Sequence, residues 1–323
     1  MSFSSVNSII KEVEKSYDIK CSVQREITGG WKNRKWKVHS CLGDVVIKEL
    51  SHERYSASRL KEVEKALMIQ SDISKNLEIV PRIFKADDRI IQEKNNFHYM
   101  IMEYIEGVHK NTFSITDREL FILGEALAHI HLMPSKTIYG DSRVLDDHFR
   151  NHQEHSKNIT IEKIRNNKFY EVCNKVKKIT ETISVDFFNN LKTGFTHSDF
   201  TKDNILFTES DVKILDFDRG RIGYQLQDVG RAIMGFTYEG DSINIDKLKH
   251  FIRGYNSIKP ITNAEVCKSL RLIWIIEVTW WFHERIFQEG IKDKLKDFRE
   301  EIIWITNNWE SLEDITDMKN LST

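Results

Sequence analysis

The chain of 323 residues is long enough for one large domain or two coupled lobes. Hydrophobic residues make up 40% of it and charged residues 30%, which excludes a disordered or fibrous protein. Its 48 basic and 49 acidic side chains give a net charge of −1. Such a chain lacks the overall positive field that duplex DNA or an anionic membrane attracts, so we expect neither partner.

The distribution of cysteines and apolar residues favours a cytoplasmic location. The cysteines are scattered, with no CxxC pair, at positions Cys21, Cys41, Cys173 and Cys267. This pattern predicts reduced thiols rather than a disulfide framework or a zinc site. The most apolar stretch, 272–282, is far short of a membrane span, and the N-terminal residues carry charges where a signal peptide needs an apolar run.

Residues 21–103 show mostly the apolar–polar alternation and the glycine-bearing turns that are typical of an antiparallel sheet. Strands are expected at 23–27, 35–38, 45–48, 82–84, 89–91 and 99–102. One amphipathic helix interrupts them, because apolar residues recur there at spacings of three and four, as Leu60, Val63, Leu67 and Met68.

Beyond Gly107 the pattern becomes mainly helical. One apolar stripe comprises Leu120, Leu123, Leu127 and Ile130, and a second comprises Leu270, Ile273, Trp274, Glu277 and Trp281. A strand-rich first third followed by a helical remainder predicts an α+β protein of two lobes with a cleft between them. We place the N-terminal lobe at 1–104 and the C-terminal lobe at 105–323.

The most informative stretch is 195–218. It contains the pattern H-x-D-x-x-x-x-N, formed by His197, Asp199 and Asn204, and then two short apolar strands around a turn, the second ending in Asp216. A strand, a tight turn and a returning strand bring the two ends of a hairpin close together. We therefore expect Asp199, Asn204 and Asp216 to converge on one small volume.

Phosphoryl transfer requires such a set of side chains. One carboxylate orients or deprotonates the attacking hydroxyl, while an amide oxygen and a second carboxylate hold Mg²⁺ against the nucleotide phosphates. The competing interpretation is that Asp and Asn at the ends of a hairpin are only turn residues. The second aspartate, Asp216, behind its own apolar strand favours the functional interpretation.

The N-terminal lobe supplies a candidate cation for the phosphates. Lys48 ends the apolar run 45–47, and Glu64 follows sixteen residues later on the amphipathic helix. A strand lysine paired with a helix glutamate fixes a cation beside the α- and β-phosphates. Glu62 is the competing partner for Lys48. Upstream, the turn at Gly29–Gly30 would let backbone N–H groups approach phosphates, although a plain hairpin turn explains it equally well.

The order of these residues resembles that in the aminoglycoside phosphotransferase and choline kinase superfamily. The resemblance rests on the motif residues above together with the segment Met102–Gly107, and it extends roughly over 27–282. It implies a bilobal, protein-kinase-like fold with a small antiparallel-sheet N-terminal lobe and a larger, mainly helical C-terminal lobe. Within the superfamily, the segments 203–207 and 123–131 look most like kinase-fold homoserine kinases and spore-coat kinase-like proteins.

The resemblance also implies roles for individual residues. Asp199 would be the catalytic base, and Asn204 and Asp216 would bind Mg²⁺. Lys48, held by Glu64, would contact the α- and β-phosphates of ATP. The backbone at the hinge would grip adenine, through Glu103 and Ile105. At the position before the base, Ser198 stands where most members have glycine.

The predicted function is therefore an ATP- and Mg²⁺-dependent O-phosphotransferase. Its acceptor would be a hydroxyl of a small, amine-bearing molecule such as an aminoglycoside-like antibiotic, homoserine or an amino alcohol. One alternative is a slow or inactive nucleotide-binding or structural protein of the spore-coat type. Another is a protein kinase, but the twelve-residue spacing from Asp216 to Asp228 leaves no room for a long activation segment.

Several nearby residues allow two interpretations. His197 is expected as a buried histidine that shapes the catalytic loop rather than a proton shuttle. Asp218 would either reach phosphate or substrate or belong to a surface turn, and Asp228 is expected to cap a helix. Glu277 would contribute to an acidic wall that selects a polycationic acceptor, although the arginine and lysine residues interleaved beyond it favour a solvated helix face.

Overall fold

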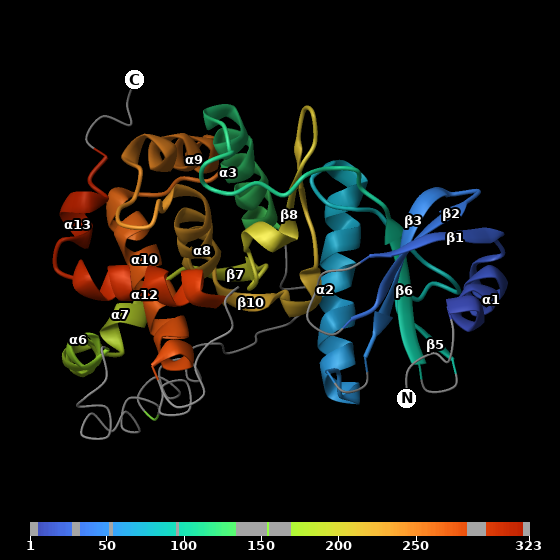
Figure 1. The fold of residues 1–323 in the computed structure, drawn as a ribbon, viewed down its shortest axis with the longest axis horizontal. Helices are drawn as coiled ribbons and strands as arrows, with labels where there is room; N and C mark the ends of the chain where they lie inside the picture. The colour runs from blue at the N-terminus through green and yellow to red at the C-terminus, as the bar shows by residue number, and fades with distance from the viewer. Residues whose placement is uncertain are drawn as a thin grey trace. The chain divides into compact units, whose positions relative to one another are not determined.

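The computed structural model describes residues 6–27, 33–51, 54–94, 97–133, 154, 169–282 and 295–318. By packing, the chain forms two compact units. Figure 1 shows the ribbon coloured by residue number from the N-terminus to the C-terminus. Unit 1 comprises 1–109 and 204–221, and unit 2 comprises 110–203 and 222–323. In the described part of the chain, none of the helices has the length and apolar character that crossing a membrane requires.

Unit 1 is built on an antiparallel sheet in the strand order β1-β2-β3-β6-β4, with β5 also paired to β6. Its strands are β1 (Cys21–Ile27), β2 (Lys35–Ser40), β3 (Gly43–Leu50), β4 (Ile83–Phe84), β5 (Gln92–Lys94) and β6 (Phe97–Glu103). The predicted strand at 89–91 is displaced, because the pairing with β6 begins at Gln92. The other predicted strands of this sheet are present.

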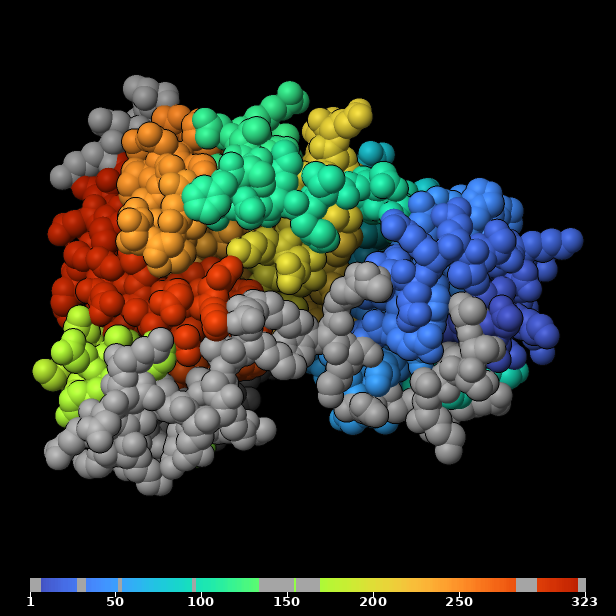
Figure 2. Space-filling model, viewed as in Figure 1, coloured from blue at the N-terminus to red at the C-terminus, as the bar shows by residue number. Residues whose placement is uncertain are grey.

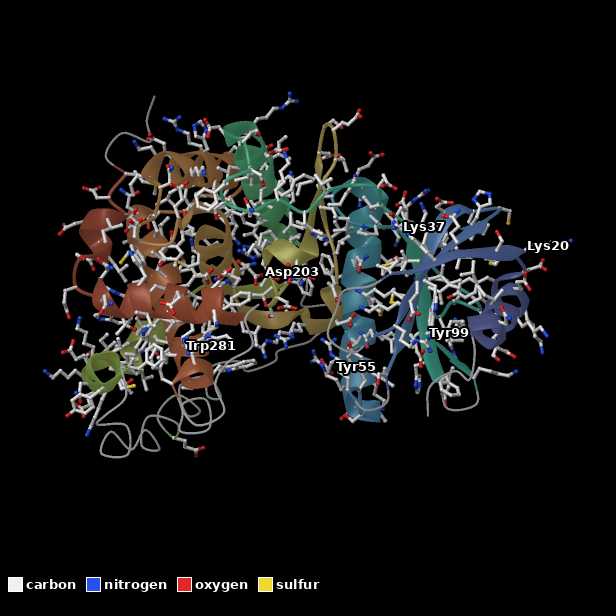
Figure 3. The ribbon with its side chains drawn as sticks, viewed as in Figure 1. Lys20, Lys37, Tyr55, Tyr99, Asp203 and Trp281 are labelled. Atoms are coloured by element: carbon white, nitrogen blue, oxygen red, sulfur yellow. The ribbon has the colours of Figure 1, made fainter. Side chains whose placement is uncertain are left out.

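Helix α1 (Val6–Tyr17) covers one face of the sheet and was not predicted from the sequence. Its apolar side chains Ile9 and Val13 are fully buried in a core that they share with Val45 and Ile47 of β3. A hydroxyl–hydroxyl hydrogen bond of 3.0 Å also joins Ser16 to Tyr99 of β6, which is labelled in Figure 3.

Helix α2 (Ala57–Asn76) is the predicted amphipathic helix. It begins at Ser56, whose hydroxyl accepts the backbone N–H of Arg59 at 3.2 Å and so satisfies one of the free donors of the first turn. Val63 and Leu67 of the predicted stripe are buried, but Met68 is 43% exposed and lies off the packed face. The buried stripe continues instead through Ala66, Ile69 and Ile73.

The hairpin of β8 (Ile205–Phe207) and β9 (Val212–Ile214) belongs to unit 1, although it lies far along the chain. Backbone hydrogen bonds hold it there: Val108 and Phe207 exchange a pair at 2.9 Å each, and Ile214 donates to the carbonyl of Ile79 at 2.8 Å. By packing, unit 1 therefore includes a segment that the predicted boundary after residue 104 assigns to the second lobe. The predicted division into a nucleotide-binding lobe at 1–104 and a catalytic lobe at 105–323 concerns function and stays a prediction.

Unit 2 is mainly helical, with a two-stranded sheet of β7 (Thr193–Thr196) and β10 (Arg221–Tyr224). Its helices are α3 (Asp117–Leu132), α6 (Tyr170–Thr182), α7 (Asp186–Asn189), α8 (Leu226–Thr237), α9 (Ile245–Ile258), α10 (Asn263–Trp281), α12 (Lys296–Asn307) and α13 (Leu312–Ile315). Reciprocal capping boxes at Thr116 with Glu119 and at Thr262 with Glu265 fix the starts of α3 and α10. Both predicted apolar stripes are buried along these two helices, apart from Glu277, which is partly exposed.

Glycine allows α3 and α9 to pack backbone against backbone, and Figure 2 shows their surfaces side by side. A Cβ atom added at Gly124 would lie 2.1 Å from the carbonyl oxygen of Phe251. One added at Gly254 would lie 1.9 Å from the carbonyl oxygen of Phe121. Both distances are far inside van der Waals contact, so any larger residue has to push the two helices apart.

We expect Gly254→Ala to lower the free energy of unfolding by about 1–3 kcal/mol, because the obstructing atom is backbone and has little freedom to move away. Urea denaturation measures this loss. Gly235→Ala is the matched control: a Cβ atom there meets no other atom within 4 Å, and alanine is the better helix former. Equal effects of the two substitutions would contradict the close packing.

Candidate active site

The ammonium of Lys48 lies beside two carboxylates of unit 1. Along β3, Val45 and Ile47 point to the α1 side, so strand alternation directs Lys48 to the opposite face. Its side chain is only 2% exposed, and its Nζ donates to Oδ1 of Asp216 at 2.8 Å and to Oδ1 of Asp218 at 2.6 Å. A buried lysine requires such compensation for its lost hydration.

Asn204 and Asp216 lie at the same end of the β8–β9 hairpin. The hairpin register pairs Ile205 with Ile214, and beyond it the backbone N–H of Leu215 donates to the carbonyl of Asn204 at 2.8 Å. Asp216 follows directly in a left-handed conformation, with φ 62° and ψ 64°. The predicted convergence of these two side chains at the end of a hairpin therefore has its backbone basis in the structure.

The donor set at this hairpin end fits Mg²⁺. An amide oxygen and a carboxylate are hard oxygen ligands, and Asp216 is 19% exposed, which leaves it accessible to an ion. Among the described residues, no group of three or more His, Cys, Asp or Glu side chains forms a metal cage. Magnesium commonly relies on one or two protein ligands, with phosphates and water completing its coordination.

The charges at this site reinforce one another. Burial favours the neutral amine of Lys48, but Asp216 and Asp218 outweigh that effect and raise its pKa. Burial likewise opposes ionisation of Asp216, yet the neighbouring ammonium groups of Lys48 and Lys35 hold its pKa well below the usual range. Lys35 lies 3.6 Å from the second oxygen of Asp216, and burial together with repulsion from Lys48 lowers its pKa. The site thus holds an ionised pair at neutral pH.

Asp199 lies in unit 2, in the loop that follows β7. His197 in this loop is fully buried and makes an edge-on ring contact with Phe200, in agreement with a structural rather than a proton-transferring histidine. Ser198 adopts φ 59°, in the left-handed region that favours glycine. Its hydroxyl lies 2.7 Å from that of Thr196, a hydrogen bond that glycine lacks.

Asp228 holds the loop that carries Asp199, so the expectation that it caps a helix is wrong. It lies in the first turn of α8, which has no side-chain cap. Its fully buried carboxylate accepts the backbone N–H of His197 at 2.6 Å and that of Ser198 at 2.9 Å. The position of Asp228 near the start of a helix suggested a cap. Its hydrogen-bond partners lie about thirty residues away in sequence, and no local sequence pattern indicates them.

A buried histidine completes this support. His131 of α3 lies with Nε2 3.3 Å from Asp228 and with Nδ1 2.8 Å from the hydroxyl of Tyr255. Because the carboxylate only accepts hydrogen bonds, Nε2 carries the proton and Nδ1 accepts from the tyrosine. Burial lowers the pKa of His131; Asp228 opposes that shift, while Lys259 and His197 add to it.

We expect acidification from about pH 7.5 to about 5.5 to destabilise the protein through His131. An unfolded histidine titrates near pH 6.5, so the unfolded chain takes up a proton that the folded chain resists. Stability should therefore fall as the pH drops through this window, by up to about 1.4 kcal/mol per pH unit. Urea titrations at several pH values measure the slope. His131→Gln should flatten it, and an unchanged slope would contradict this assignment.

The structure differs from the sequence on the partner of Lys48. Among the described residues, the ion pairs of Lys48 are those with the two aspartates, and none joins it to Glu64 or Glu62. Glu62 pairs instead with Lys65, one helical turn along, at 2.9 Å. The predicted pairing failed because the spacing of Lys48 and Glu64 carried no information on the aspartates 168 and 170 residues away.

The remaining predicted site residues lie in unit 1 or outside the described residues. Glu103 ends β6, where its backbone N–H donates to the carbonyl of Arg82 at 2.8 Å and its carboxylate receives the Arg82 guanidinium at 3.3 Å. Ile105 follows two residues later, before the strand-like bridge at Val108. Gly29 and Gly30 lie outside the residues that the structure describes.

Comparison with known proteins identifies the family. The model of a family described as the phosphotransferase enzyme family matches residues 23–261. The chain belongs to this family. A homoserine kinase of Granulibacter bethesdensis (strain ATCC BAA-1260 / CGDNIH1) is 27% identical over 93 residues, which are 28% of this chain and 29% of that enzyme. The match thus spans under a third of this relative's length.

Solved structures of other small-molecule kinases share the fold over nearly the whole chain. A spectinomycin phosphotransferase in complex with ADP and spectinomycin has a TM-score of 0.63 and 14% identity, covering 98% of this chain and 99% of that one. A choline kinase from Cryptosporidium parvum has a TM-score of 0.63 and 15% identity, covering 96% and 97%. The family match confirms the predicted superfamily. The likeness to these structures confirms the predicted protein-kinase-like fold, with an antiparallel N-terminal sheet and a helical C-terminal region.

Proposed function

We propose that the protein is an ATP- and Mg²⁺-dependent O-phosphotransferase that transfers the γ-phosphoryl group to a hydroxyl of a small, amine-bearing molecule. The observation that carries the proposal is the 2.8 Å pair of Lys48 with Asp216, at the hairpin end that also bears Asn204. Binding of a nucleoside triphosphate requires a cation beside oxygen ligands for a divalent metal, and Lys48 with Asp216 and Asn204 would provide both. Membership of a phosphotransferase family supports the same conclusion.

The nucleotide would be held by unit 1. Lys48 would contact the α- and β-phosphates, and the turn predicted at Gly29–Gly30 would add backbone N–H groups. Asn204 and Asp216 would hold Mg²⁺, which when bound would neutralise charge on the phosphates. The adenine would meet the backbone of Glu103 and Ile105. The backbone N–H of Glu103 already donates to the carbonyl of Arg82. Glu103 would therefore offer the base its own backbone carbonyl rather than its N–H.

Asp199 would orient the acceptor hydroxyl and take its proton as the phosphoryl group is transferred. A carboxylate suits this role because it accepts a hydrogen bond from the hydroxyl before it receives the proton. The carboxylate of Asp228 accepts hydrogen bonds from the backbone N–H groups of His197 and Ser198. These bonds would restrain the loop, so that Asp199 meets the acceptor in one orientation.

The acceptor class rests on what the similar proteins are named for. Spectinomycin, choline and homoserine are each a hydroxyl compound that also carries an amine or ammonium group. That shared chemistry supports an amine-bearing alcohol as the acceptor of this protein.

A coupled ADP-release assay with Mg²⁺-ATP tests the proposal. The panel would comprise aminoglycoside-like antibiotics, amino-acid alcohols such as homoserine and amino alcohols such as choline. We expect one class to stimulate ADP release well above the rate with water alone. Binding of Mg²⁺-ATP without turnover on any acceptor would favour a nucleotide-binding or structural protein, and transfer of a γ-label to protein would favour a protein kinase.

A further inference from the structure

Lys48 is shared between two aspartates that differ in their surroundings. Asp216 is 19% exposed, whereas Asp218 is 1% exposed. Asp216 has a second task in the proposed function, because its carboxylate is a candidate ligand of Mg²⁺. Whenever Asp216 turns to an ion, Lys48 needs another partner to keep its ammonium in place.

Asp218 is fixed from several directions within unit 1. Its Oδ1 accepts from Lys48, and its Oδ2 accepts from the hydroxyl of Tyr55 at 2.5 Å and from Nδ2 of Asn33 at 3.2 Å. The guanidinium of Arg59 in α2 donates to its backbone carbonyl at 2.8 Å. Tyr55 and Asn33 are themselves buried and joined by a 2.9 Å hydrogen bond, so the carboxylate has no room to leave. Tyr55 is labelled in Figure 3.

We propose that Asp218 is the positioning residue of Lys48, the role that the sequence assigns to Glu64, and that it keeps the ammonium directed at the nucleotide phosphates. The inference rests on the proposed function, since it concerns the same nucleotide site. A lysine side chain has many rotamers, and ordering it at the moment of binding costs affinity. Asp218, itself locked by Tyr55 and Asn33, orders Lys48 before the nucleotide arrives.

Nucleotide binding without metal provides the test. In EDTA, calorimetry would compare the affinities of ADP and adenosine for the wild-type protein and for Asp218→Asn, which keeps the size of the side chain. We expect the variant to bind ADP roughly 10-fold more weakly, as when a charge-assisted hydrogen bond is lost, and adenosine with unchanged affinity. Equal losses for both ligands would indicate general damage to the unit and overturn the proposal.

A double-mutant cycle shows whether Asp218 acts through Lys48. Lys48→Met should weaken ADP binding by itself, and adding Asp218→Asn to it should produce little further loss. Additive losses would overturn the positioning role. A loss that occurs only when Mg²⁺ is present would also overturn it, since Asp218 would then be a metal ligand.

Two further variants keep the inference testable if Asp218→Asn does not fold. Tyr55→Phe removes one donor from Asp218 without changing the ring and should weaken ADP binding by a smaller factor in the same sense. Glu64→Gln should weaken ADP binding less than Asp218→Asn or Tyr55→Phe does. A larger loss would show that Glu64, and not Asp218, positions Lys48. If the wild-type protein binds ADP no better than adenosine, the proposed function fails rather than the role of Asp218.

Discussion

Replacing Asp199 by asparagine is expected to lower kcat roughly 10²–10⁴-fold while ATP still binds, the size expected for the loss of a general base. Asparagine has the same shape and accepts a hydrogen bond, but it cannot take up the hydroxyl proton at neutral pH. Nucleotide binding should survive because Lys48, Asn204 and Asp216 lie in unit 1, whereas Asp199 lies in unit 2 and is supported there by Asp228.

The measurement combines ADP release in the presence of the best acceptor with calorimetric binding of Mg²⁺-ATP. Asp203→Asn is the matched control: it removes the same charge four residues along the chain from an exposed side chain, labelled in Figure 3. We expect that control to keep most of its activity. Unaltered turnover in Asp199→Asn would show that Asp199 is not the general base.

Arg231→Met should lower the free energy of unfolding by about 3–5 kcal/mol, because it leaves the buried carboxylate of Glu301 and the partly buried carboxylate of Glu277 without their cation. Nη1 of Arg231 in α8 lies 3.0 Å from each carboxylate oxygen of Glu277 in α10, and its Nη2 pairs with Glu301 of α12. Its guanidinium lies 5.0 Å from the ring centroid of Phe298. The side chains of Arg231 and Glu301 are only 5% and 4% exposed, so water cannot replace the lost charge.

Arg271→Met is the matched control for this loss. Arg271 makes the same kinds of contact, an ion pair with Glu313 at 3.0 Å and a ring contact with Trp309 at 5.4 Å, but Glu313 is 71% exposed. Exposed pairs contribute about 0–1 kcal/mol. Denaturant unfolding of both variants measures the difference, and equal losses would show that the Arg231 cluster is not a structural element of unit 2.

The Arg231 cluster also bears on the acceptor. Glu277 was a candidate for an acidic wall that selects polycations, but its carboxylate is already neutralised by a buried guanidinium. The alternative of a solvated helix face does not fit it either, since the side chain is 17% exposed. Glu277 is therefore a structural residue that links α8 to α10, and acceptor selection has to rest on other side chains.

Much of the local structure could be predicted from the sequence, because each element needs only its own residues. Alternation along β3 and β6 marked them as strands, and the spacing of Leu120, Leu123 and Leu127 marked α3 as a helix with one buried face. Helix α1 was not predicted, although Ile9 and Val13 stand at the four-residue spacing of a buried helix face. The strand expected at 89–91 was displaced, because pairing rather than composition decides where a short strand begins.

The candidate site likewise has features that local sequence predicts and features that depend on distant contacts. The placement of Asn204 and Asp216 at one end of a hairpin follows from two apolar strands and a turn, which are local features. The partner of Lys48 and the roles of Asp218 and Asp228 were not predictable, because hydrogen bonds join them to residues 30 to 185 positions away. The sequence left Asp218 either as a residue that reaches phosphate or substrate or as part of a surface turn, and its burial against Tyr55 and Asn33 shows that it is not a surface residue.

The sequence by itself determined that this chain has a strand-rich first part, a helical remainder and a hairpin with Asn204 and Asp216 at one end. It could do so because periodicity and motif spacing are properties of neighbouring residues. Only the tertiary structure decided which acid holds the lysine, which acid holds the loop of Asp199 and which cation neutralises Glu277. Those choices depend on which side chains are buried together, and burial is decided by the packing of segments that are remote in sequence.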